Sequence, residues 1–337
     1  HRTDSFHGAF PHLVDGASGR TIPFRASSRK DDGGDLVETS YLCMGLLCAR
    51  QYFKHDTSGE TELRRNIDRI WEQIDWRWYT RNGANVLYWH WSPNNGWGMN
   101  QEIRGWNECL VAYILAASAP VHDIDAQVYH HGWPQGYTFR NGRSYYDIHL
   151  QLGPHFGGPL TFAHYSFIGL DARELRDRYA DYWNQNLSHV LINREHCIRN
   201  PNGFKGYGPA CWGLAATDDE AGRWGCDPES DEGVIRPTAA LSSFPYAPKE
   251  CMAVLRHFVH ELDDKIMGKY GFCDAFCEND GWAADFCYSI NQGPIICMIE
   301  NYRSALLWDL FMSNSCIQKG LQKLGFRYRE PVPCIHP

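Results

Sequence analysis

The sequence lacks the features that mark several large classes of protein. No run approaches the roughly 18 to 20 consecutive apolar residues that a membrane-spanning helix requires, so we expect no membrane span. Acidic residues outnumber basic ones by 40 to 32, and the formal net charge is −8. Nucleic acids and anionic membrane surfaces would repel such a chain, so we expect neither as a partner.

Motifs for common cofactor and catalytic sites are also missing. The patterns GxGxxG, Walker A, HExxH and GxSxG do not occur, which leaves nucleotide-binding, zinc-protease and serine-hydrolase functions without support. The cysteines do not repeat the CxxC spacing of zinc sites, and the acidic run 31–35 lacks the spacing of an EF-hand. We therefore predict no metal and no cofactor.

Cysteine and aromatic residues are abundant. The 13 cysteines are an odd number, so at least one lacks an intrachain partner. Pairs such as Cys43 with Cys48, or Cys273 with Cys277, are either disulfides of an oxidising compartment or small buried hydrophobes. Aromatic residues make up 14% of the chain. They suit a carbohydrate cleft, where sugars stack on rings, but they equally suit a large core.

Apolar residues recur with helical periodicity along most of the chain. Helices are predicted over these ranges: 35–52, 63–74, 106–117, 175–186, 251–262 and 296–310. Gly-Pro at 293–294 is expected to start the last of them. Strand-like alternation is rare, although 137–150 suggests a hairpin about Asn141-Gly142. The pattern predicts one all-α domain over residues 1–337, with its long loops gathered into a functional face.

Carboxylates are concentrated before the first predicted helix, in the segment 31–38. Asp35 and Glu38 lie three residues apart, as the first and last residues of a capping box do. Capping and sugar binding are compatible, because a carboxylate that accepts a backbone N–H can also accept a sugar hydroxyl.

A second polar and aromatic segment, 86–108, ends at Glu108. Trp89 and Trp91 alternate with His90, so an extended backbone would place both rings on one side. Cleavage of a glycosidic bond needs a protonated carboxylic acid, and burial against rings raises a carboxyl pKa as required. Glu108 is a candidate for that role, and an ion pair with Arg104 is the alternative.

The C-terminal part of the chain offers candidates for a base that activates water. Asp285 is our choice, and Asp274 is its nearest rival. Glu300 and Arg303, three residues apart, are expected to form a structural ion pair. His164 is a further candidate for contact with a ligand, although lone histidines usually have structural roles.

Seven blocks of the chain resemble the bacterial glucoamylase-like family, which includes β-1,2-glucanases and a domain of cyclic β-1,2-glucan synthases. They are FHGAFPH (6–12), KDDGGDLVETSYL (30–42), NVLYWHWSP (85–93), IRGWNE (103–108), FAHYSFIGLD (162–171), TAALSSFPY (238–246) and QGPIICMIENYRS (292–304). The resemblance implies an (α/α)6 toroid with the substrate cleft where the inner-helix loops meet. Family members usually have further helices before the first block, so we expect a chain that is processed or truncated at His1 and lacks N-terminal helices.

The resemblance also implies roles for individual residues. Glu108, in the GWNE block, is implied as the general acid of an inverting hydrolysis, and Asp285 is our choice of base. Family members often have Asp-Gln-Gly where this chain has Asn291-Gln292-Gly293, so any role for an acid at 291 is lost. The expected substrate contacts are Asp31, Asp35, Glu38, Trp89, His90, Trp91, Arg104, Trp106, Asn107, His164, Tyr165, Trp212, Tyr246, Gln292, Asn301 and Arg303.

The predicted function is therefore hydrolysis of β-1,2-glucan, either endo-acting or sophorose-releasing, by a secreted or periplasmic enzyme. An oligo- or polysaccharide is the expected partner. Hydrolysis of another glucan, such as an α-glucan, and non-catalytic glycan binding are the alternatives.

Overall fold

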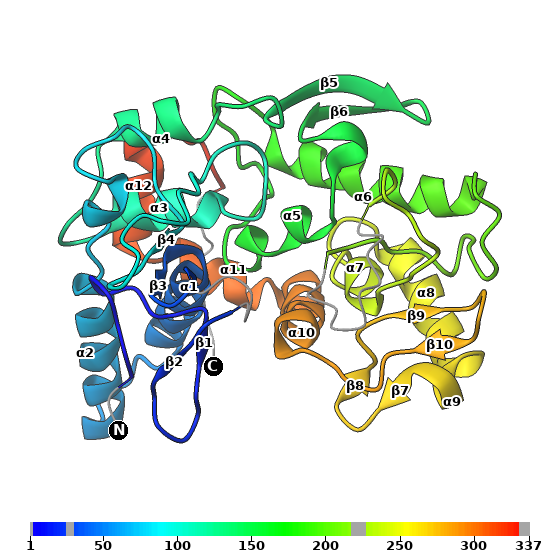
Figure 1. Ribbon diagram of the computed structural model, residues 1–337, viewed down its shortest axis with the longest axis horizontal. Helices are drawn as coiled ribbons and strands as arrows, with labels where there is room; N and C mark the ends of the chain where they lie inside the picture. Colours follow the sequence, from blue (N-terminus) through cyan, green and yellow to red (C-terminus); the bar gives the residue numbers. More distant parts are fainter. Residues whose placement is uncertain (1–2, 25–29, 217–226, 330–337) are drawn as a thin grey trace. The chain divides into compact units, whose positions relative to one another are not determined.

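The structure is a computed structural model that describes residues 3–24, 30–216 and 227–329. Helices form most of its regular structure (Figure 1). Within the described ranges, the strands form only two-stranded antiparallel sheets. The helix-rich, all-α character predicted from periodicity is confirmed. In the described part of the chain, no helix combines the length and apolarity needed to cross a bilayer.

Contacts between residues group the chain into two compact units. Unit 1 contains residues 3–24, 30–105, 109–136 and 308–329, and unit 2 contains residues 106–108, 137–216 and 227–307. The organisation of residues 1–337 as one domain stays a prediction.

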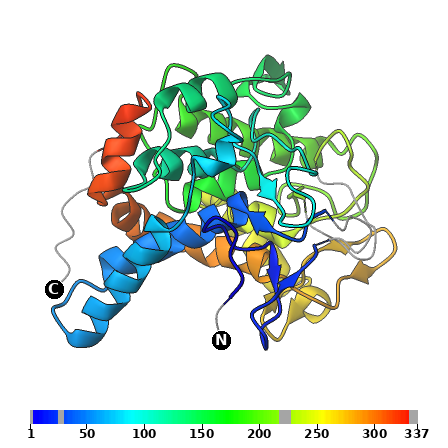
Figure 2. The same ribbon diagram turned by 60° about the vertical axis from the view of Figure 1, so that its left-hand side comes forward.

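Unit 1 is built around a fully buried helix, α3 (Leu110–Ser118). The helix α1 (Leu36–Tyr52) packs against α3 and against α2 (Ser58–Glu72), and α12 (Ser315–Lys323) lies along α3 (Figures 1 and 2). The close approach of α12 depends on Gly320, since a Cβ there would lie 1.8 Å from Ser118 Oγ. The remaining elements are β1 (Leu13–Val14), β2 (Thr21–Ile22), β3 (Gly34–Asp35), the 3₁₀ turn Trp78–Thr80, β4 (His90–Trp91) and α4 (Ala126–Gly132).

Unit 2 combines longer helices with short hairpins. The hairpin of β5 (Arg140–Tyr145) and β6 (Ile148–Leu152) packs on α6 (Tyr182–Arg199), and α7 (Pro237–Leu241) contacts α8 (Pro248–His260) and α10 (Ser289–Ser304). Shorter elements are α5 (Thr161–His164), α9 (Asp263–Ile266), β7 (Met267–Gly268), β8 (Gly271–Phe272), β9 (Phe276–Cys277), β10 (Trp282–Ala283) and the 3₁₀ turns His155–Gly157 and Ser166–Ile168. The chain passes from unit 2 back to unit 1 within α11 (Leu306–Met312).

Most predicted helices exist, but several of their ends were wrong. The ranges 35–52, 63–74 and 251–262 correspond to α1, α2 and α8. The helix predicted from residue 175 begins only at Tyr182, because the side chain of Asp181 caps it by accepting the N–H of Asn184. The last predicted range is split between α10 and α11 at Ala305, whose φ is +58°. Pro294 lies inside α10 rather than in its first turn.

The predicted hairpin is present, but its turn is not at Asn141-Gly142. The chain reverses at Tyr146 and Asp147, with φ of +55° and +65°, as a two-residue hairpin loop requires. Asn141 and Gly142 instead form a bulge in β5, where the register shifts between Arg140 and Arg143. The φ of Gly142 is +68°, so the glycine that suggested a turn serves the bulge.

The two cysteine pairs suggested by the sequence are not disulfides. Cys43, Cys273 and Cys277 all have free thiols in the described structure. Cys43 and Cys277 are also buried, as expected for cysteine acting as a small hydrophobe.

Candidate functional site

Glu108 is the last residue of the segment 106–108 and directly precedes Cys109, the N-cap residue of α3. Its backbone carbonyl accepts a hydrogen bond from the Ser166 hydroxyl, which fixes the segment within unit 2. The side chain is half-buried, and burial raises the pKa of its carboxyl group. A raised pKa increases the protonated fraction near neutral pH, which is the property that a general acid needs.

Trp106 anchors this segment by packing in the core of unit 2. Its side chain is only 1% exposed and stacks on Tyr182, with ring centroids 5.8 Å apart, beside Phe167 at 6.2 Å. In this position the ring packs against protein side chains, whereas Asn107 next to it is half-buried. Trp106 therefore has no exposed ring face with which to make the predicted contact with substrate.

A buried polar network connects four residues of unit 2. The Tyr165 hydroxyl donates to Asn291 Oδ1 at 3.2 Å, and Asn291 Nδ2 donates to Asp274 Oδ1 at 2.7 Å. Arg236 Nη1 lies 3.4 Å from Asp274 Oδ2. The side chains of Arg236 and Asp274 are each 1% exposed, so the network forms part of the core while Tyr165 remains half-buried.

The two candidate bases differ in their surroundings. Asp285 follows β10 and is exposed, whereas Asp274 is buried in the network. The backbone joins their segments, because Asp274 N–H donates to the Phe286 carbonyl at 3.1 Å and Ala284 N–H donates to the Ala275 carbonyl at 2.9 Å. Pairing of Glu108 with Asp285 stays a prediction.

Three predicted contact residues of unit 2 lie in its core. His164 Nε2 is 2.9 Å from Ser243 Oγ, and burial lowers the pKa of His164 to about 3, so the ring is neutral at ordinary pH. The Tyr246 hydroxyl donates to the Ala163 carbonyl at 3.0 Å. Trp212 is 0% exposed. All three side chains are buried, so none of them offers a free surface to a substrate.

The last three predicted residues of unit 2 lie on α10. Gln292 Nε2 donates to the Phe272 carbonyl at 2.9 Å and Asn301 Nδ2 donates to the Ile168 carbonyl at 2.9 Å. Arg303 Nη1 pairs with Glu300 Oε2 at 2.7 Å on the exposed face of the helix. The structural ion pair predicted for Glu300 and Arg303 is confirmed.

In unit 1, Asp35 performs the capping role that its position predicted. Its Oδ1 accepts the N–H groups of Val37 and Glu38, both at 2.9 Å. Its Oδ2 contacts two side chains, His12 Nδ1 at 2.9 Å and Trp89 Nε1 at 3.0 Å. The Asp35 side chain is only 2% exposed, so these partners occupy much of its hydrogen-bonding capacity. Glu38, in the first turn, is half-buried.

Asp31 and His90 form a second contact in the same unit. His90 Nε2 is 3.2 Å from Asp31 Oδ1 and 3.1 Å from the donating N–H of Gly33. Burial raises the pKa of Asp31 and lowers the pKa of His90. Both shifts favour the neutral forms of the two side chains.

Aromatic rings gather beside these acids. His90 is buried and paired in β4, while Trp89 and Trp91 are half-buried, as the predicted alternation requires. Trp91 meets Trp78 edge-on at 5.7 Å, and Trp78 stacks on His7 at 3.7 Å. Trp78 and His7 were not among the predicted site residues, although the aromatic-rich stretch 76–79 could have indicated Trp78. Arg104 Nη2 pairs with Glu102 Oε2 at 2.5 Å.

One cluster has the donor atoms of a metal site. Within the described ranges, Cys211, His257 and Glu278 are the group of three whose ligand atoms lie close enough together to hold an ion. No sequence motif indicates this cluster, because residues 211, 257 and 278 come from distant segments.

The family model described as putative glucoamylase matches residues 100–315. Among curated proteins, an exo β-1,2-glucooligosaccharide sophorohydrolase (non-reducing end) of Parabacteroides distasonis is 41% identical over an alignment of 346 positions. The alignment covers 96% of this chain and 47% of that protein. The chain thus spans about half the length of this curated relative.

Solved structures resemble it over almost its whole length. A putative glucoamylase from Bacteroides uniformis is 53% identical with a TM-score of 0.94, and the match covers 97% of this chain and 79% of that one. An endo-β-1,2-glucanase from Chitinophaga pinensis, solved as a sophorotriose and glucose complex, is 50% identical with a TM-score of 0.93 and coverage of 97% and 78%. The resemblance found in the seven sequence blocks is confirmed, and the chain belongs to the family described as putative glucoamylase.

Proposed function

We propose that the chain hydrolyses β-1,2-linked glucan. The Parabacteroides distasonis relative is named for β-1,2-glucooligosaccharides and the Chitinophaga pinensis relative for β-1,2-glucan, and each match covers nearly all of this chain. The observation that carries the proposal within the molecule is the half-buried Glu108, whose carboxyl pKa is raised by burial. A glycosidic oxygen is a poor leaving group, and such a carboxyl group can protonate it.

In the proposed mechanism Glu108 donates its proton to the glycosidic oxygen while a carboxylate removes a proton from the attacking water. An inverting reaction of this kind needs the two carboxyl groups about 6.5 to 9.5 Å apart, and a retaining one about 5 to 5.5 Å. We propose inversion, with Asp285 as the base. Asp285 is exposed and therefore open to water, whereas Asp274 already accepts from Asn291 and faces Arg236.

We also propose the (α/α)6 toroid and a secreted or periplasmic location. The toroid is supported by the helix-rich structure and the high TM-scores to the solved relatives. The location is supported by the nature of the substrate, since a polymeric glucan does not cross a membrane unaided. Cell fractionation tests the location.

The test of the activity compares the wild type with Glu108→Gln on linear β-1,2-glucan and on starch, with products resolved by chain length. We expect products from β-1,2-glucan alone, and a loss of roughly 10² to 10⁴ in kcat for the variant, the usual contribution of acid–base catalysis. Glu195→Gln is the matched control, because it removes the same charge from the ion pair with exposed Arg199, outside the expected substrate contacts, and it should leave the rate unchanged.

Other outcomes identify the alternatives. Products from starch would show an α-glucan hydrolase, and products from neither substrate would show a binding protein. Wild-type turnover by Glu108→Gln would eliminate Glu108 as the acid. Asp285→Asn and Asp274→Asn, assayed in parallel under conditions in which both remain folded, decide the base: the variant that loses activity while folded identifies it.

A further inference from the structure

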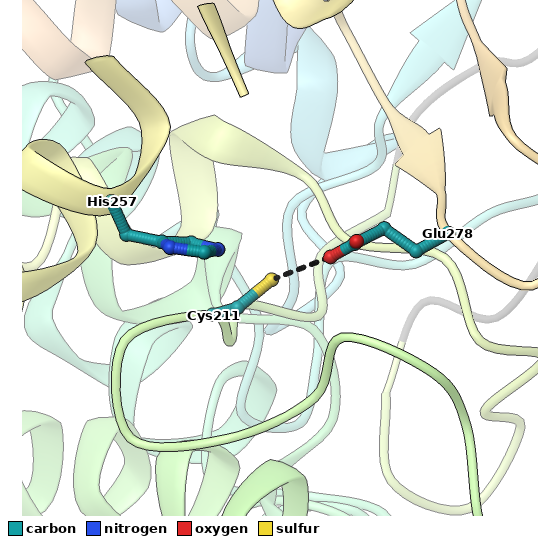
Figure 3. Close-up of side chains that lie close together, drawn as sticks. All are labelled: Cys211, His257 and Glu278. Atoms are coloured by element: carbon teal, nitrogen blue, oxygen red, sulfur yellow. Dashed lines mark hydrogen bonds between the residues drawn. The ribbon is translucent and has the colours of Figure 1, made fainter. Parts of the chain in front are cut away.

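Three side chains of unit 2 converge from separate elements onto one point (Figure 3). Cys211 lies in the loop after α6, His257 in α8, and Glu278 directly after β9. The ligand atoms of all three lie within 4.8 Å of one another, and Cys211 Sγ is 4.0 Å from Glu278 Oε1. In Figure 3 the imidazole and the carboxylate approach the sulfur from opposite sides.

The backbone holds two of these residues in place. Cys211 exchanges two main-chain hydrogen bonds with Gly208, at 3.0 and 3.1 Å, which closes a tight loop. Cys277, the neighbour of Glu278, is paired with Trp282 across the β9–β10 hairpin. The convergence therefore follows from fixed main-chain positions rather than from flexible side chains alone.

Space for the carboxylate depends on a glycine. A Cβ at Gly206 would lie 2.0 Å from Glu278 Oε1, and the φ of Gly206 is +86°, a conformation that favours glycine. A larger residue there would displace the Glu278 carboxylate from the cluster.

The chemistry of the three donors is selective. A thiolate and an imidazole favour zinc and related transition metals, whereas calcium and magnesium favour oxygen ligands. Zinc sites with three protein ligands take them from cysteine, histidine and carboxylate side chains, and water occupies the fourth position. A thiolate beside a carboxylate would place two negative charges in contact, and a divalent cation between them would neutralise this repulsion.

We propose that Cys211, His257 and Glu278 bind one Zn²⁺ ion, which ties the loop at 208–211 to α8 and to the β9–β10 hairpin. This site is independent of the proposed glucan hydrolysis, because none of its three residues is assigned a role there. The expected consequence is stabilisation of unit 2 upon zinc binding, since a ligand that binds only the folded state raises its stability. His257 and Glu278 are half-buried, so an ion can reach the cluster.

The test uses the whole purified chain, stripped with a chelator and dialysed against Zn²⁺. Metal analysis should give one tightly held zinc per chain, and the thermal midpoint should rise with zinc concentration. Cobalt substitution should give a thiolate-to-cobalt charge-transfer absorption. Cys211→Ser, His257→Gln and Glu278→Gln should each weaken zinc binding by about 10-fold or more, as loss of even an outer-shell partner can.

Matched controls come from the same unit. Cys297→Ser changes a half-buried thiol in α10, and His260→Ala changes an exposed histidine in α8; both should bind zinc as the wild type does. Circular dichroism identifies any variant that fails to fold, and the two remaining ligand variants then decide. No zinc retained by the wild type, equal retention by Cys211→Ser, or displacement of zinc by equimolar Ca²⁺ would each overturn the proposal, leaving a thiol that donates to a carboxylate.

Discussion

The buried pair of Arg236 and Asp274 supports a prediction about stability that also bears on catalysis. Both side chains are 1% exposed, with Nη1 and Oδ2 3.4 Å apart. Asp274→Asn keeps the shape of the acid but leaves a buried guanidinium facing a neutral group. Breaking a buried pair in this way costs about 3 to 5 kcal/mol, and because 3.4 Å is long for a charged hydrogen bond, we expect about 3 kcal/mol.

The partner variant should cost less. Arg236→Met leaves Asp274 with its hydrogen bond from Asn291 Nδ2 at 2.7 Å, so we expect a loss of about 2 kcal/mol, within the usual range for a buried charged group that loses one partner. The double variant removes both charges and should cost less than the sum of the two, with a coupling of about 1 to 2 kcal/mol.

Urea unfolding followed by far-ultraviolet circular dichroism measures these free energies. Additive losses, within about 0.5 kcal/mol, would show that the two side chains do not interact and would refute the argument. The same three variants also distinguish a structural role of Asp274 from a catalytic one. If Asp274 is only structural, the double variant hydrolyses substrate normally under conditions in which it remains folded; if Asp274 is the base, the folded double variant is inactive.

Three further outcomes are expected. Burial lowers the pKa of His164 to about 3, below the value of about 6.5 in the unfolded chain. The contribution of the neutral His164 ring to stability is therefore complete above pH 6.5 and is lost as the pH falls towards 3. The free energy of urea unfolding should fall by about 2 kcal/mol between pH 7 and 5, and this loss should be absent in His164→Gln. Asp35→Ala should lower the free energy of unfolding by about 1 to 3 kcal/mol, since it removes a helix cap and the bond from Trp89; a loss below about 0.5 kcal/mol would contradict the capping role. Gly142→Val should lower the free energy of urea unfolding by about 1 to 2 kcal/mol because its φ is +68°, whereas Gly45→Ala, inside α1 with open space around it, should be neutral or stabilising in the same measurement.

Local patterns predicted much of this molecule. Periodicity located α1, α2 and α8, and the predicted cap at Asp35 is present, although the Asp35 N–H donates to the Phe10 carbonyl rather than to Glu38 as in a capping box. Helix ends that depend on a single side chain were missed, as at Asp181, because periodicity does not report caps. The turn at Tyr146 and Asp147 was missed for a related reason: Asn-Gly satisfies both a turn and a bulge, and only strand pairing decides between them.

The candidate site was predicted less completely. Glu108 stood out because its sequence block pairs an acid with aromatic residues, and burial then gives it a raised pKa. The sequence does not reveal that Trp106 and Trp212 are buried, because the same residue type serves a core and a sugar platform. The cluster of Cys211, His257 and Glu278 depends on contacts between distant segments, and no local motif encodes those contacts.

Pro294 within α10 has a consequence for motion. Proline has no N–H to offer the carbonyl four residues earlier, that of Ile290, and its ring crowds that carbonyl. The opening turn of the helix is thus joined to the rest by one fewer backbone bond, and Ile290 is 43% exposed. Two side chains anchor that turn: Asn291 is held by Asp274 and Tyr165, and Gln292 donates to the Phe272 carbonyl. Amide exchange in this turn should consequently report on the integrity of the buried network itself.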